Sequence, residues 1–214
     1  MFILNILSDK ILGECIREIK SSQKSIYLTF DDGPNQFCTP QVLDLLKKYN
    51  IHASFFLIAE NILPNIEIFN RIKNEGHAIG NHSLDHNTLT YFKGEIALEH
   101  WIDCGEKIIA SYLGHPSIGF RPPAGVRTPP LKKIMNKINS KPIMWKHRFY
   151  DTYIIFTDSA WKKKIQKIKD GDIVLLHDTH KTPEKFLASL ENLIKYLIKN
   201  KYQIIKLPAT KIFT

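Results

Sequence analysis

The sequence Ser25-Ile26-Tyr27-Leu28-Thr29-Phe30-Asp31-Asp32-Gly33-Pro34 joins a β-rich, apolar run to two adjacent carboxylates and a Gly-Pro turn. The run Ser25–Phe30 predicts a short buried strand, and Gly33-Pro34 turns the chain away from its end. Two neighbouring carboxylates repel each other unless a cation lies nearby. An Asx-capped turn would account for the pair equally well, so its meaning depends on the rest of the chain.

Strand-like and helical patterns alternate from this stretch to the C-terminus. Further strands are expected at His52–Ile58, His77–Gly80, Ile118–Arg121, Pro142–Trp145, Asp172–Leu176 and Tyr202–Leu207. Helices are expected at Pro40–Tyr49, Ile62–Asn74, Lys93–Leu113, Pro129–Ile138, Ser159–Ile168 and Lys185–Lys199. This alternation predicts an α/β fold with parallel strands covered by helices. A β/α barrel and a doubly wound sheet both satisfy the pattern.

Before the first strand, apolar residues recur every three or four positions, at Leu4, Leu7, Ile11, Cys15 and Ile19. The spacing predicts an amphipathic helix within residues 1–24, packed on the domain or in peripheral contact with a membrane. Residues 25–214 carry no linker and predict a single domain. The first ten residues lack a basic segment and a small-residue cleavage site, so we expect a location in the cytoplasm or at the inner membrane face.

The 214 residues include 30 Lys and Arg against 21 Asp and Glu, a formal charge of +9. This balance favours anionic partners. No basic run carries the interleaved aromatics of a nucleic-acid reader, so we expect no nucleic-acid partner. Three scattered cysteines do not form a disulfide framework.

Polar side chains capable of chemistry follow the predicted strands, at the end where β/α enzymes build active sites. They are Asp31, Asp32, His82, His86, Arg121, His177 and Asp178. Two histidines four residues apart can reach one metal ion, although two unrelated surface histidines would show the same spacing. With Asp32 as an oxygen ligand, His82 and His86 would leave coordination positions open, as catalytic metal sites do.

The chain resembles the polysaccharide deacetylase family, the NodB-homology domain of carbohydrate esterase family 4, from Ser25 to Leu207. Thr29–Pro34 resembles its first motif, TFDDGP, and His82–His86 its histidine pair. Phe120–Gly125 is similar to the third motif, usually RPPYG, and Leu175–Asp178 to the fifth, usually LLHD. The resemblance implies a distorted (β/α)7 barrel, here with an added N-terminal helix. It also implies a hydrolase that removes N-acetyl groups from an amino-sugar glycan.

The resemblance implies a role for each site residue. Asp32, His82 and His86 would hold a divalent metal, most often Zn²⁺, with Co²⁺ or another first-row ion as alternatives. The metal would polarise the acetyl carbonyl and acidify a bound water. Asp31 would be the general base, and Arg121 would pair with it.

His177 would protonate the departing amine, and Asp151 would orient His177. A backbone N–H of the loop Pro123, Ala124 and Gly125 would stabilise the oxyanion, and Leu175 would line the pocket for the acetyl methyl.

Two positions depart from the family pattern. Ala124 stands where the third motif usually has Tyr, and Thr152 follows Asp151 where the family usually has Trp. Both replacements remove aromatic surface that would stack on sugars, so we expect a more open groove. The basic run Lys146–Arg148 raises the hypothesis of an anionic or lipid-phosphate-linked sugar.

The glycan itself is left open among peptidoglycan, a chitin-like oligomer and a lipid-linked sugar. An O-acetyl ester hydrolase is the first alternative function. A catalytically degenerate glycan-binding module is the second, and the two missing aromatic residues motivate it.

Overall fold

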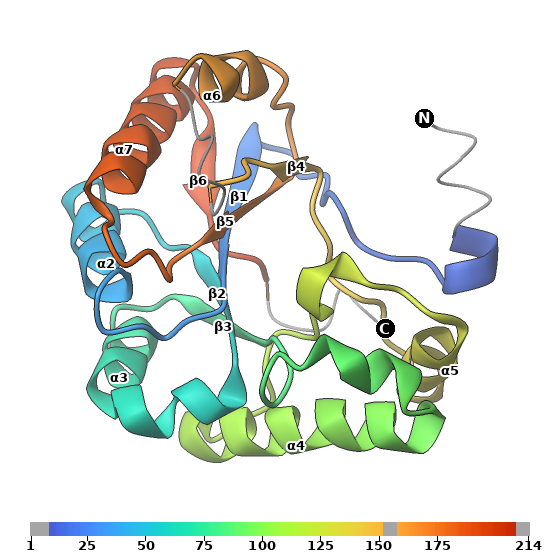
Figure 1. The fold of residues 1–214 in the computed structure, drawn as a ribbon. Helices are drawn as coiled ribbons and strands as arrows, with labels where there is room; N and C mark the ends of the chain where they lie inside the picture. The colour runs from blue at the N-terminus through green and yellow to red at the C-terminus, as the bar shows by residue number, and fades with distance from the viewer. Residues whose placement is uncertain (1–8, 152–157, 209–214) are drawn as a thin grey trace.

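The structure, a computed structural model, describes residues 9–151 and 158–208 (Figure 1). Its strands are β1 (Ser25–Asp31), β2 (Ser54–Leu57), β3 (Ala78–Asn81), β4 (His147–Arg148), β5 (Ile173–His177) and β6 (Gln203–Ile205). Its α-helices are α2 (Thr39–Lys48), α3 (Ile66–Asn74), α4 (Glu95–Leu113), α5 (Pro129–Lys137), α6 (Asp158–Ile165) and α7 (Glu184–Lys199). Short 3₁₀ helices are η1 (Ala59–Asn61), η2 (Leu63–Asn65), η3 (Thr88–Phe92) and η4 (Pro123–Gly125). The alternation expected from the sequence is confirmed except at two of the expected strands, Ile118–Arg121 and Pro142–Trp145.

All the strand pairs are parallel, in the order β3-β2-β1-β5-β4, with β6 also paired to β1. The first half of β1, Ser25–Tyr27, pairs with β6, and its second half, Thr29–Asp31, pairs with β2. β5 pairs along the opposite edge of β1 over Tyr27–Asp31. β1 is therefore the central strand, and its carboxyl end lies beside those of β2 and β5.

Two expected strands, Ile118–Arg121 and Pro142–Trp145, form only isolated bridges and single hydrogen bonds. Phe120 bridges to Asn81 at the end of β3, and the Ile143 N–H donates to the Phe120 carbonyl at 2.9 Å. The Lys146 N–H then donates to the Ile173 carbonyl of β5 at 2.9 Å. Prolines in and beside both segments supply no N–H, which limits regular pairing there. These contacts join β3 to β5 through the two segments and close the sheet into a distorted barrel, as the resemblance implied.

The N-terminal segment differs from the expected helix. Among the described residues only positions 9–12 are helical, and Gly13 follows with φ +85°. The chain then runs extended, with the Ile16 N–H donating to the Pro142 carbonyl at 2.9 Å and the Ile19 N–H to the Gly171 carbonyl at 2.8 Å. Ile16 and Ile19 pack against the buried apolar cluster that includes Ile143 and Ile173, so the segment fills a gap in the barrel wall. The helical prediction is therefore wrong for residues 13–24, and its residues 1–8 lie outside the described part.

No helix in the described part of the chain is long and apolar enough to cross a membrane.

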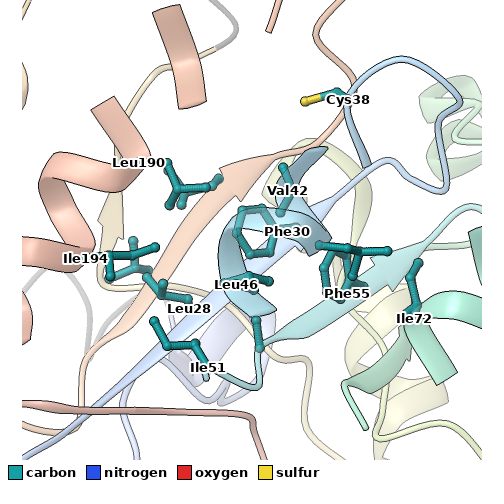
Figure 2. Close-up of a cluster of buried hydrophobic side chains, with 14 of the residues drawn as sticks. Leu28, Phe30, Cys38, Val42, Leu46, Ile51, Phe55, Ile72, Leu190 and Ile194 are labelled. Atoms are coloured by element: carbon teal, nitrogen blue, oxygen red, sulfur yellow. The ribbon is translucent and has the colours of Figure 1, made fainter. Parts of the chain in front are cut away.

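The alternation of side chains along β1 separates core from site. Leu28 and Phe30 point into the apolar layer beneath α2 and α7, where Phe30 stacks on Phe55 with ring centroids 5.1 Å apart (Figure 2). Burial of each such side chain contributes about 1.5–3 kcal/mol. Thr29 and Asp31 point to the opposite face, into the barrel. A packed core on one face thus fixes the polar residues on the other.

Candidate active site

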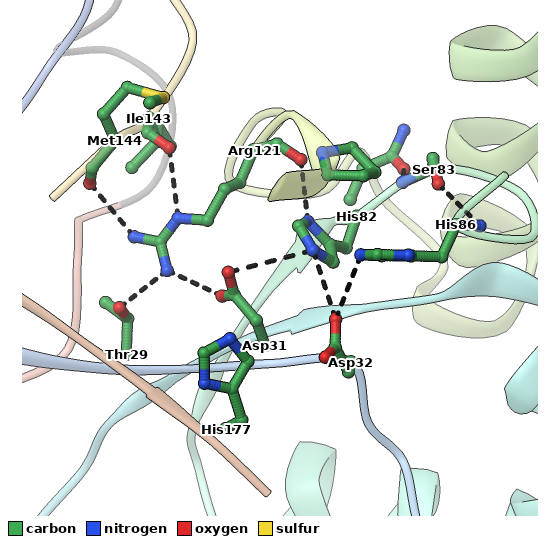
Figure 3. A network of polar contacts seen from close by, with 12 residues as sticks. Thr29, Asp31, Asp32, His82, Ser83, His86, Arg121, Ile143, Met144 and His177 are labelled. Carbon is green, nitrogen blue, oxygen red and sulfur yellow. Dashed lines mark hydrogen bonds and ion pairs between the residues drawn. The ribbon is translucent and has the colours of Figure 1, made fainter. Parts of the chain in front are cut away.

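The carboxyl ends of β1, β3 and β5 bring the predicted site residues together (Figure 3). Asp31 ends β1, and it is the direct register partner of His177 at the end of β5. His82 follows β3, and its imidazole lies over Asp32. Arg121 enters from the segment that bridges to β3. The convergence expected at this end of the strands is confirmed.

Asp32, His82 and His86 form a three-sided cluster of possible metal ligands whose ligand atoms all lie within 4.8 Å of one another. Asp32 Oδ1 lies 3.3 Å from His82 Nε2 and 3.5 Å from His86 Nε2. His82 Nδ1 donates to the Arg121 carbonyl at 2.8 Å, which leaves the lone pair of Nε2 facing the cluster. Asp32 Oδ1 is buried and has no hydrogen-bond partner among the described residues. Two imidazole nitrogens and an unsatisfied buried carboxylate oxygen fit a divalent cation.

The protonation tendencies of the cluster agree with this fit. Burial raises the pKa of Asp32, but the imidazoles of His82, His177 and His86 outweigh it, and the net pKa lies below its ordinary value. Burial, together with the neighbouring His82, lowers the pKa of His86. A lowered pKa favours the neutral imidazole, which is the form that binds metals.

Arg121 fixes the second carboxylate of the pair. Its guanidinium is fully buried and donates to Asp31 Oδ1 and Thr29 Oγ1, both at 2.7 Å. It also donates to the carbonyls of Ile143 and Met144, at 3.1 and 3.2 Å. Asp31 Oδ2 is not used by Arg121 and lies 3.8 Å from His82 Nε2. One oxygen of Asp31 is therefore anchored, and the other faces the candidate metal ligands.

His177 and Asp151 form a buried pair on the other side of Asp31. Asp151 Oδ1 accepts from His177 Nδ1 at 3.0 Å, and Oδ2 accepts from the His177 backbone N–H at 2.7 Å. Burial raises the pKa of Asp151, but donors from His177 and His180 outweigh it and bring it to about 2. Burial lowers the pKa of His177, but Asp151 outweighs it, so the net pKa is raised. His177 thus keeps a proton to higher pH than an ordinary histidine does.

The third-motif loop forms a tight turn at the mouth of the site. Ala124 is exposed, has φ +54°, and its N–H has no acceptor among the described residues. A Cβ on Gly125 would lie 2.6 Å from the Trp145 ring, so this position requires glycine. Pro123 is buried, and its carbonyl accepts from the Tyr91 hydroxyl at 3.3 Å. Leu175 is 1% exposed and shares the inner face of β5 with His177.

The expected basic groove is not formed by Lys146 and His147. Lys146 Nζ pairs with Glu18 at 2.7 Å, and His147 Nε2 contacts Asp172 at 2.7 Å. Glu18 bridges to Asp172 beside the start of β5, at the end of the strands opposite the site. Thr152, the other departure from the family pattern, lies outside the described residues.

Two polar residues to which the sequence analysis assigned no role also lie beside the site. Asp178 is fully buried beneath the first-motif turn, where burial raises its pKa to about 7 and Thr39 donates to it at 2.5 Å. His180, which has no motif support, lies 3.4 Å from Asp151 Oδ2. The sequence feature that could have indicated both residues is their position within three residues of His177.

Comparison with known proteins gives the family of the chain. The family model for polysaccharide deacetylase matches residues 18–143. The chain belongs to the polysaccharide deacetylase family.

Among its relatives, this deacetylase is similar to a peptidoglycan-N-acetylglucosamine deacetylase of Bacillus cereus, with 33% identity over 88% of each chain. It is also similar to a chitooligosaccharide deacetylase of Azorhizobium caulinodans, with 32% identity over 78% of this chain and 80% of the relative. Several other relatives are longer, and the chain covers 38% of their length. A solved peptidoglycan N-acetylglucosamine deacetylase bound to an N-oxidanyl-benzamide superposes with a TM-score of 0.82 and 27% identity, over 94% of this chain and 93% of that one.

Proposed function

We propose that the chain hydrolyses N-acetyl groups on an amino-sugar glycan and releases acetate. The observation that carries the proposal is the meeting of three groups at one end of the barrel: the Asp32, His82 and His86 cluster, the Arg121-anchored Asp31, and the Asp151–His177 pair. Relatives named for the deacetylation of peptidoglycan and chitooligosaccharides support it.

Asp32, His82 and His86 would hold one divalent cation. Nitrogen and oxygen ligands of this kind accept Zn²⁺ and Co²⁺ among the first-row ions. Such a cation, when bound, supplies Lewis acidity and lowers the pKa of water toward about 7.

Asp31 acts as the general base that takes a proton from the attacking water. Its free Oδ2 is the acceptor, since Oδ1 is held by Arg121 at 2.7 Å. The buried guanidinium, itself fixed by two carbonyls and Thr29, holds the carboxylate in this orientation. Positioned proton transfer of this kind contributes roughly 10²–10⁴-fold to a rate.

His177 acts as the general acid that protonates the departing amine. Asp151 binds Nδ1, so Nε2 is the atom that faces the reaction. The unengaged N–H of Ala124 is the donor for the tetrahedral oxyanion, and Pro123 and Gly125 hold its turn. Leu175 lines the floor where the acetyl methyl would lie.

The raised pKa of His177 favours amide over ester cleavage, because an amine leaves poorly unless it is protonated. The complete set of acid, base and ligand residues speaks against a glycan-binding module without activity. Peptidoglycan, chitin-like and lipid-linked sugars all remain substrates to test. Contact of residues 1–24 with a membrane, an inner-face or cytoplasmic location and the domain boundary at residue 24 stay predictions.

The proposal is tested by acetate release from N-acetylglucosamine oligomers and from peptidoglycan fragments. The protein is first treated with a chelator and then given Zn²⁺ or Co²⁺. We expect release only with metal, with little release from O-acetylated xylan oligomers. Metal-independent release, or release from the ester alone, would contradict the proposal.

A further inference from the structure

Both carboxylate oxygens of Asp151 accept hydrogen bonds from residues 177–180. Oδ1 binds His177 Nδ1, and Oδ2 accepts from the His177 backbone N–H. A second imidazole, His180, approaches the same Oδ2 through Nε2 at 3.4 Å. The Asp151 side chain is 0% exposed, so these donors, rather than water, determine its orientation.

His180 is itself held in place from behind. Its ring stacks on Phe186, with centroids 4.3 Å apart and planes inclined by 23°. Phe186 lies in the first turn of α7, is 3% exposed, and belongs to the main apolar core. The His180 side chain is only 14% exposed. A rotation of His180 away from Asp151 would break this stack, so the core fixes the imidazole.

We propose that His180 is a positioning residue for deacetylation, acting through Asp151. With Nε2–H on Oδ2, it opposes rotation of the carboxylate, which keeps Oδ1 on Nδ1 of His177. The Nε2 of His177 then stays aimed at the departing amine. The chain of contacts runs from the core through Phe186, His180 and Asp151 to the acid.

This inference rests on the proposed function, in which His177 is the acid. Within the described part of the chain, His180 makes no hydrogen bond or ion pair with Asp32, His82 or His86, and its Nε2 lies against Asp151. It therefore acts on the reaction through Asp151, which orients His177.

The test compares His180→Leu with His180→Gln, whose amide N–H can still reach Oδ2. For His180→Leu we expect kcat for acetate release to fall about tenfold with KM within about twofold, because a misdirected acid slows the chemical step rather than binding. His180→Gln should recover most of that loss. The exposed His115→Leu, on the loop after α4, is the matched control and should change neither constant.

A proton NMR measurement gives a readout that does not need activity. The hydrogen-bonded Nδ1–H of His177, identified by its loss in His177→Gln, should give a low-field signal in the parent protein and in His180→Gln. It should broaden or disappear in His180→Leu, while thermal unfolding of all three stays cooperative. An unchanged signal and kcat in His180→Leu would overturn the inference, as would equal losses in the Leu and Gln variants. If the parent releases no acetate, the proposed function fails, yet the signal still decides the role of His180.

Discussion

Arg121 is the largest of the fully buried side chains, and its charge is neutralised by Asp31 alone among the described acids. Burial lowers the pKa of Arg121, and Asp31 opposes that shift. Arg121→Met should therefore leave Asp31 buried without the guanidinium that neutralises it and cost about 3–5 kcal/mol of unfolding free energy. Urea unfolding measures this loss.

The double variant Arg121→Met, Asp31→Leu is the control, because it removes both charges. It should recover part of the lost stability while staying inactive. Equal stability of the single variant and the parent would show that the pair is not buried as described.

The Asp151–His177 pair determines how kcat/KM depends on pH at the alkaline side. Because the pKa of His177 is raised above 6.5, its acid form is lost only as the pH rises through that raised value. Asp151→Asn removes the charge that raises this pKa, and burial then lowers it. The alkaline limb of kcat/KM should move to lower pH, and the maximum should fall about 10²-fold. A pH–rate profile tests this, and an alkaline limb that stays in place would contradict the assignment of His177 as the acid.

At the scale of elements, α4 packs directly under the turn that carries the histidine pair. A Cβ on Gly105 would lie 2.8 Å from the carbonyl carbon of Ser83 and 2.9 Å from Asn81 Oδ1. Alanine normally stabilises a helix interior by roughly 0.5–1 kcal/mol over glycine. Here Gly105→Ala should instead displace the turn and weaken metal binding about tenfold.

Calorimetric titration of the metal-free protein with Zn²⁺ measures this effect. Cys104→Ala, one residue earlier on α4 and partly exposed, is the control and should bind as the parent does. Tighter or unchanged binding by Gly105→Ala would mean that α4 does not set the position of His82 and His86.

Some of these elements could be predicted from the sequence, and others could not. The β1 segment and the helices α2 and α7 that cover it were predictable, because apolar periodicity and turn residues agree there. Ile118–Arg121 and Pro142–Trp145 were not distinguishable from strands, since their pairing depends on neighbours distant in sequence. The segment after Gly13 has helical spacing, but tertiary pairing with β5 and its neighbours overrides it.

The candidate site was predictable where a motif carries it, as for Asp31, Asp32, His82 and His86. The orientation of Asp151 by His180 was not, because a lone histidine has no pattern. The prediction that Lys146 and His147 line the substrate groove was wrong. A shift of one residue along a strand moves a side chain to the other face, and the acids that pair with these residues come from segments distant in sequence.

At the scale of the whole molecule, the N-terminal segment completes the barrel wall. Gly171 and Gly114 allow a matched test, because their φ angles are +81° and +82°. A Cβ on Gly171 would lie 2.6 Å from the Ile19 carbonyl, whereas a Cβ on Gly114 would meet nothing within 4 Å. Both alanine variants carry the same backbone strain of about 1–3 kcal/mol. Gly171→Ala should lose more unfolding free energy in urea, and the excess measures the contact with Ile19. Equal losses would mean that the segment does not stabilise the barrel.

The adjacent carboxylates have different roles in the proposed mechanism: Asp31 is the general base, and Asp32 is a metal ligand. The most direct measurement determines bound Zn²⁺ and acetate release on the same preparations of the parent, Asp31→Asn and Asp32→Asn. The account predicts that Asp31→Asn binds one equivalent of metal as the parent does but releases acetate at least about 10²-fold more slowly. Asp32→Asn should lose the metal and the activity together. Acetate release at the parent rate by metal-loaded Asp31→Asn would contradict the account.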